Sequence, residues 1–184
     1  EYGDAIAQSI ASLRQARLRW RAAQGDGVQV RQFPSPDLLA GAVRLLSVAL
    51  YPVRLGGFRG EADGEDQFVA EALEAAFAIL RGEILSEFAY WQGYADAAFD
   101  ADLPQRLVNL FATTLGDIRA LLDEDIAAAF LGDPAARTAD EILISYPGAL
   151  AILHHRIAHQ LHSLGVPIVA RMISELANAR TGID

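Results

Sequence analysis

Three histidines near the C-terminal end of the chain are the first residues whose spacing could do chemistry. His155, His159 and His162 are separated by four and three positions, so on a helix they share one face within an arc of about 60°. Three imidazoles on one face resemble half of a metal site. A zinc site needs ligands that converge on one tetrahedral ion, however, and side chains stacked along one helix do this poorly. We therefore favour packing and hydrogen bonding between helices for these histidines, and expect no metal site.

A second group with possible chemistry is a run of carboxylates, made of Asp117, Asp123, Glu124 and Asp125. Paired carboxylates can serve as acid and base or hold two metal ions. Di-iron helical bundles use Glu-x-x-His pairs on facing helices, and the chain has no such pair. We interpret this run as a solvated acidic face of a helix.

Proline and glycine punctuate the last fifty residues. Asp133 followed by Pro134 predicts a helix N-cap with proline at the first helical position. A helix is expected over residues 149–164, closed by Gly165 in the left-handed conformation, and a last helix ends at Gly182.

The preceding residues predict a helical scaffold. Hydrophobic residues make up 52% of the chain and are mostly Ala, Leu and Ile, which favours an all-α fold of six to eight helices with the long ones antiparallel. Helices are expected over residues 4–24, from Pro36 to about residue 51, and over 61–91, where an aromatic and aliphatic stripe indicates core rather than a cofactor box. After a loop around residues 100–104, one long helix should end near Gly132.

Charge and cysteine content exclude several classes of protein. The net charge is −9, there is no lysine, and the arginines are scattered among carboxylates, so nucleic acid is not an expected partner. The chain has no cysteine, which excludes disulfides and thiolate metal sites and makes the cytoplasm the default location. No apolar run approaches the roughly 20 residues that a membrane span requires, so no membrane is expected either.

Several motifs between residues 133 and 184 together resemble serine O-acetyltransferase, in its helical N-terminal region and in the EpsC-like subgroup. A looser similarity covers residues 33–35 and 51–58. The motifs that carry the resemblance, in chain order, are Asp133-Pro134-Ala135-Ala136, Tyr146-Pro147-Gly148, His155-Arg156-Ile157-Ala158-His159-Gln160-Leu161, Gly165-Val166-Pro167, Ala170-Arg171-Met172-Ile173-Ser174-Glu175 and Thr181-Gly182-Ile183-Asp184.

The resemblance implies acetyl transfer from acetyl-CoA to the hydroxyl of L-serine, in cysteine synthesis. The catalytic half of such enzymes is a left-handed β-helix, entered through an Asp-Ile-His-Pro motif whose aspartate forms a dyad with a histidine on a later coil. Asp184 falls on that aspartate. The serine hydroxyl is a poor nucleophile, so an imidazole must take its proton and a carboxylate must orient that imidazole.

The resemblance also assigns a substrate-binding role to Asp133, with Pro134 beside it. In the family this aspartate reaches the amino group of bound serine, and a carboxylate suits an ammonium group through a charge-assisted hydrogen bond. The expected site residues are therefore Asp184 as catalytic, and Asp133 and Pro134 as substrate-binding.

The resemblance also carries expectations about the rest of the enzyme. Residues 1–132 would be a scaffold and oligomerisation domain, and residues 133–184 a helical hairpin that leads into a β-helix absent from these residues. We expect these 184 residues to bind no cofactor, to be inactive alone and to self-associate, since the family forms hexamers as dimers of trimers. Acetyl-CoA would be the cosubstrate of the full-length enzyme, and a missing C-terminal tail would bind O-acetylserine sulfhydrylase. The alternative is a helical assembly module without catalysis.

Overall fold

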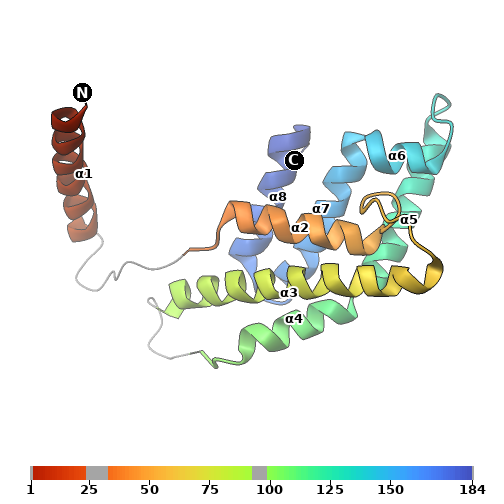
Figure 1. Cartoon of the computed structure of the whole chain (residues 1–184), viewed down its shortest axis with the longest axis horizontal. Coiled ribbons are helices and arrows are strands. Elements are labelled where there is room, and N and C mark those ends of the chain that lie inside the picture. Colours follow the sequence, from red (N-terminus) through yellow and green to blue (C-terminus); the bar gives the residue numbers. More distant parts are fainter. Residues whose placement is uncertain (1, 24–32, 93–98, 184) are drawn as a thin grey trace.

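The computed structural model describes residues 2–23, 33–92 and 99–183, and these form eight helices and no strand (Figure 1). The all-α prediction is thereby confirmed. The helices are α1 (Gly3–Ala23), α2 (Pro36–Leu50), α3 (Ala62–Gln92), α4 (Leu103–Thr113), α5 (Leu115–Gly132), α6 (Ala139–Ser145), α7 (Pro147–Ser163) and α8 (Pro167–Thr181).

Helix α1 lies apart from the other seven helices (Figure 1). None of its residues is buried, and its large apolar side chains are about half exposed or more. Such a face is usually covered in a folded protein, because exposed apolar surface is unfavourable in water. Ile6, Ile10, Leu13 and Trp20 share that face, and Leu18 lies on another side of the helix.

The remaining helices share one hydrophobic core. Helix α2 packs along α3, and α7 packs along α8, with further contacts of α2 and α3 to α8 and of α5 to α7. Among the fully buried side chains are Leu46 of α2, Leu80 of α3, Phe111 of α4, Ile157 of α7 and Ile173 of α8. The core joins residues on both sides of position 132, and the division into segments 1–132 and 133–184 stays a prediction.

A buried carboxylate fixes the start of α8. Glu87 of α3 has no exposed surface, and its two carboxylate oxygens accept hydrogen bonds from the backbone N–H groups of Ile168 (2.9 Å) and Val169 (2.8 Å). The first N–H groups of a helix have no partner within the helix, and the helix dipole favours a negative charge there. Glu87 therefore provides acceptors for two N–H groups that have no partner within α8, and these hydrogen bonds offset the free-energy cost of burying its carboxylate.

Helix α2 begins as its sequence predicts. Ser35 is the N-cap, its side chain accepts a hydrogen bond from Leu38 N–H, and Pro36 occupies the first turn. Glu83, one turn before Glu87 on α3, accepts a hydrogen bond from the backbone N–H of Ser35. Two neighbouring buried carboxylates of α3 thus hold the starts of both α2 and α8.

The single long helix expected up to Gly132 is wrong, because two helices, α4 and α5, meet at Thr114. Two consecutive threonines lie at this break. Thr113 and Thr114 donate from Oγ1 to the carbonyls of Leu110 and Phe111, and Thr114 N–H also bonds to Phe111 O. Such bonds compete with the helical ladder.

The ends of α7 and α8 are as predicted. Gly165 (φ 83°) and Gly182 (φ 69°) both adopt the left-handed conformation that closes a helix. None of the described helices combines the length and the apolar character that a membrane span needs.

Replacing Glu87 should destabilise the whole fold. In Glu87→Ala two N–H groups at the start of α8 lose their partners, and we expect the free energy of unfolding to fall by about 2–4 kcal/mol. Urea denaturation followed by circular dichroism measures the change. Glu74→Ala, at an exposed position of the same helix, is the control. A Glu87→Ala variant as stable as that control would show that the cap is not needed.

Candidate functional site

Asp133 is the site residue whose geometry the structure describes most fully. It ends α5 in an extended conformation (φ −116°, ψ 102°) and is half-buried. Oδ1 of its carboxylate accepts a hydrogen bond from Ala135 N–H (2.9 Å), and Oδ2 accepts one from the hydroxyl of Tyr146 (2.6 Å). The carboxylate is therefore held in one orientation from two sides.

The predicted N-cap role of Asp133 is wrong. No helix follows Pro134, because the Asp133 carboxylate and the Asp133 carbonyl bind the N–H groups of Ala135 and Ala136 in a turn. Helix α6 begins five residues later, and its N-cap is Thr138, whose hydroxyl accepts a hydrogen bond from Glu141 N–H. Pro134 itself is exposed beside the turn.

The hydrogen bonds to Asp133 keep its carboxylate ionised. The Tyr146 hydroxyl, followed by the N–H of Ala135, lowers the pKa of Asp133 below its usual value. In return, the pKa of Tyr146 is raised because its proton is held by the carboxylate. A permanently negative group at this position suits a cationic ligand.

Asp184 lies outside the described residues, so its catalytic role stays a prediction. The residues just before it are described. Thr181 Oγ1 donates to Ala177 O (2.8 Å) and accepts from Ile183 N–H (3.2 Å), which fixes the turn after α8. The chain therefore leaves α8 in a defined direction up to Ile183.

The packing role predicted for the three histidines is wrong. His155, His159 and His162 are exposed, and the rings of His155 and His159 are stacked with their centroids 5.9 Å apart. The buried histidine is His154, which is 4% exposed. His154 follows Leu150 by four residues and precedes Ile157 by three, so it lies on the apolar face of α7 with Leu153. This spacing could have predicted its burial. Within residues 2–23, 33–92 and 99–183, no group of three or more His, Asp or Glu could hold a metal ion.

The acidic face of α5 is solvated only in part. Asp117, Asp123 and Glu124 are exposed, as predicted. Asp125 is half-buried and makes a bidentate ion pair with Arg156 of α7 (2.9–3.0 Å). This pair joins α5, which ends at Asp133, to α7, which begins next to Tyr146.

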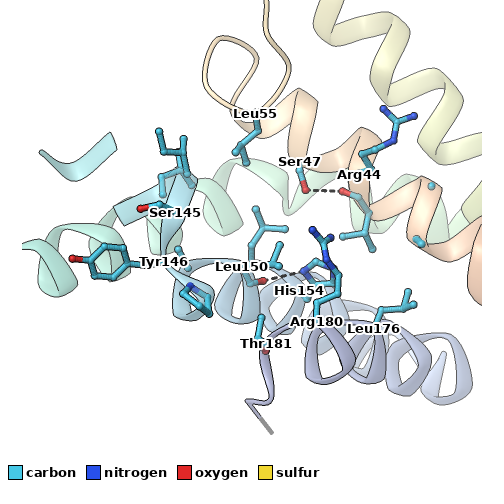
Figure 2. A pocket seen from close by; sticks show the side chains of 18 residues that line it. Arg44, Ser47, Leu55, Ser145, Tyr146, Leu150, His154, Leu176, Arg180 and Thr181 are labelled. Atoms are coloured by element: carbon cyan, nitrogen blue, oxygen red, sulfur yellow. Dashed lines mark hydrogen bonds between the residues drawn. The ribbon is translucent and has the colours of Figure 1, made fainter. Parts of the chain in front are cut away.

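A cavity of about 680 Å³ opens between α2, α6, α7 and α8 (Figure 2). Tyr146, whose hydroxyl binds Asp133, and Thr181 both line it. In Figure 2 the Tyr146 hydroxyl points away from the other labelled side chains of the cavity, and it donates its hydrogen bond to Asp133. Asp133 and Pro134 are not among the lining residues.

Comparisons with known proteins agree on one family. The chain is 36% identical over 163 residues to a plasmid-encoded serine acetyltransferase of Synechococcus elongatus, a match that covers 85% of this chain and 50% of that protein. It is 44% identical over 64 residues to the serine acetyltransferase of Bacillus subtilis, covering 35% of this chain and 30% of that protein. A comparison with protein-family models finds no match.

A solved structure supports the same family. The crystal structure of serine acetyltransferase isoform 3 in complex with cysteine, from Entamoeba histolytica, matches 93% of this chain and 57% of that one, with a TM-score of 0.64 and 25% identity. At the level of the family, the matches thus support a serine acetyltransferase, and the helical fold fits the N-terminal part of such an enzyme. The chain spans about half the length of these two relatives.

Removing the Tyr146 hydroxyl should change the acidity of Asp133. The hydrogen bond stabilises the ionised carboxylate, so in Tyr146→Phe the pKa of Asp133 should rise toward its usual value of about 4. Because the pKa of Asp133 is lower in the folded state than in the unfolded state, its ionised form stabilises the fold at pH values above the unfolded-state pKa. This stabilisation is lost as the pH falls through the folded-state pKa. The stability difference between wild type and Tyr146→Phe should therefore shrink in acid.

The measurement is an NMR titration of the Asp133 carboxyl carbon in both proteins. Tyr2→Phe, which removes an exposed hydroxyl far along the chain, is the control and should leave the titration unchanged. Identical Asp133 titration curves in wild type and Tyr146→Phe would contradict this account of the hydrogen bond.

Proposed function

We propose that these residues belong to an enzyme that transfers the acetyl group of acetyl-CoA to the hydroxyl of L-serine. The observation that carries the proposal is the match over 85% of the chain to a serine acetyltransferase. The motifs near Asp133 and before Asp184 support it, and so does the way in which Asp133 is held. The EpsC-like subgroup is part of the proposal.

In this proposal Asp133 binds the ammonium group of L-serine. Its carboxylate is ionised and oriented by Tyr146 and Ala135, so it needs no rearrangement before it meets a cation. Each carboxylate oxygen has a further lone pair, because the hydrogen bonds in the structure use one on each. A preorganised anion of this kind binds an ammonium group with charge-assisted hydrogen bonds.

Asp184 has a different role in the proposal. It would orient a histidine that takes the proton of the serine hydroxyl as that oxygen attacks the thioester carbonyl of acetyl-CoA. The bond from the carbonyl carbon to serine oxygen forms, the bond to sulfur breaks, and coenzyme A leaves as the thiol. The resemblance implies that the base histidine stands on a later coil of the β-helix, outside residues 1–184. We therefore expect residues 1–184 alone to show no turnover and to bind no coenzyme.

Substitutions should separate the two aspartates. In the full polypeptide that the gene encodes, we expect serine-dependent release of coenzyme A. Asp184→Asn should lower kcat by about 10³–10⁴-fold, as loss of an orienting carboxylate does in hydrolase triads. Asp133→Asn should raise the KM for serine by about 10–100-fold and leave the KM for acetyl-CoA unchanged. Thiol detection of released coenzyme A measures both.

Asp117→Asn is the matched control and should behave as wild type, because Asp117 is an exposed aspartate of α5 with no hydrogen bond or ion pair among the described residues. Wild-type kcat and KM values in both Asp133→Asn and Asp184→Asn would contradict the roles proposed for these two residues. Absence of serine-dependent coenzyme A release in the full polypeptide would remove the proposed activity.

We also propose that the chain self-associates, in line with the hexamers of the family. The exposed apolar face of α1 supports this, since no other described helix covers it. A hexameric state, binding of O-acetylserine sulfhydrylase through residues beyond this chain, and a cytoplasmic location are further parts of the proposal.

Charges on the apolar face of α1 should weaken self-association. Ile10→Asp with Leu13→Asp places two carboxylates on that face, and we expect a smaller assembly by analytical ultracentrifugation. Gln8→Asp with Gln15→Asp adds the same charges on the opposite face of the helix and should leave the mass unchanged. Equal masses for wild type and both double variants would contradict a role of this face.

A further inference from the structure

The cavity between α2, α6, α7 and α8 has a lining whose charge is opposite to that of the chain. Eighteen residues line it, and none of them is Asp or Glu, although the chain has 24 acidic and 15 basic residues. Arg44 of α2 and Arg180 of α8 are both among the lining residues. An electropositive cavity in a protein with a net charge of −9 points to an anionic ligand.

Neither cavity arginine is neutralised within the described part of the chain. Arg44 and Arg180 are exposed and form no ion pair or hydrogen bond there. The ion pairs of the described residues use other arginines, namely Arg54, Arg106, Arg119 and Arg156. The guanidinium of Arg180, with several N–H donors, is therefore available to a ligand, whereas that of Arg44 points away from the cavity in Figure 2.

A buried imidazole adds a polar group to the cavity. His154 lines the cavity and is 4% exposed, and its Nδ1 lies 2.9 Å from Leu150 O, which can only accept, so Nδ1 carries a proton. Nε2 makes no hydrogen bond among the described residues. Arg180 extends from α8 toward α2 beside this ring (Figure 2). Burial lowers the pKa of His154, the hydrogen bond to Leu150 O opposes this, and the charge of Arg180 lowers the pKa further, so the site favours the neutral ring.

Apolar side chains form most of the remaining wall. They come from the loop after α2 and from α6, α7 and α8, and the volume of about 680 Å³ lies in the range of small-molecule sites. A bare inorganic anion would leave this wall in contact with water, whereas a ligand with a hydrocarbon part would cover it. The larger aliphatic residues are Leu55, Leu143, Ile144, Leu150, Leu153 and Leu176.

We propose that this cavity binds a small aliphatic carboxylate. The carboxylate pairs with the guanidinium of Arg180, and the hydrocarbon chain packs on the leucines of α6, α7 and α8. Arg44 lines the α2 side, but its guanidinium points away from the cavity, so it contributes positive charge only from a greater distance. Nε2 of His154 accepts a hydrogen bond from a hydroxyl or amino group of the ligand where it has one. The proposal does not rest on acetyl transfer to serine.

An NMR titration of the ¹⁵N-labelled chain with hexanoate tests the proposal. We expect saturable shifts at Arg180, His154 and Ser47, and binding more than about tenfold tighter than for acetate, because each buried methylene adds about fourfold. Hexanamide, which lacks the charge, should not bind in the same range. Arg180→Gln should weaken hexanoate binding about tenfold or more, and Arg44→Gln by a smaller factor.

Arg171→Gln is the matched control, since Arg171 is an exposed arginine of the same helix that does not line the cavity. It should bind hexanoate like the wild type. Thermal unfolding of each variant reports whether it is folded. If Arg180→Gln does not fold, the comparison of Arg44→Gln with the wild type and the comparison of the ligands test the proposal instead. Hexanoate binding unchanged in both cavity variants, or shifts centred on Arg171, would overturn the site. Inorganic phosphate binding as tightly as hexanoate would overturn the ligand class.

Discussion

The bond between the Glu87 carboxylate and the start of α8 is the interaction on which the arrangement of the other helices depends. A carboxylate without exposed surface is costly to bury unless its oxygens are hydrogen-bonded, and here the N–H groups of Ile168 and Val169 provide those bonds. The dipole of α8 also favours a negative charge at its N-terminus, so the Glu87 carboxylate and the start of α8 stabilise each other. With α8 fixed on α3, α7 must pack antiparallel to α8.

The position of Asp133 follows from that packing. Helix α7 is tied to α5 by the bidentate pair of Arg156 and Asp125, and the residue before α7, Tyr146, donates to the carboxylate at the end of α5. The candidate site is therefore held at a junction of two helices and not on a free loop. Preorganisation of this kind reduces the cost of binding a charged substrate.

Local signals in the sequence predicted the all-α fold and several helix ends, and long-range contacts explain part of what they missed. The Ser35-Pro36 cap and the closing glycines depend only on neighbouring residues, and they are as predicted. The partner of Glu87 is 81 residues away and that of Asp133 is 13 residues away, so no local pattern could show them. Asp133 was expected to cap a helix because Asp-Pro does so often, but its carboxylate is used in a turn and by Tyr146.

The family resemblance predicts the site segment, while the structure shows how the Asp133 carboxylate is held. The most direct test of the proposed function is a crystal structure of the full gene product with L-serine bound. The proposal predicts the serine ammonium group within hydrogen-bond distance of the Asp133 carboxylate, and an imidazole between the Asp184 carboxylate and the serine hydroxyl. Serine bound with its ammonium group away from Asp133 would contradict it.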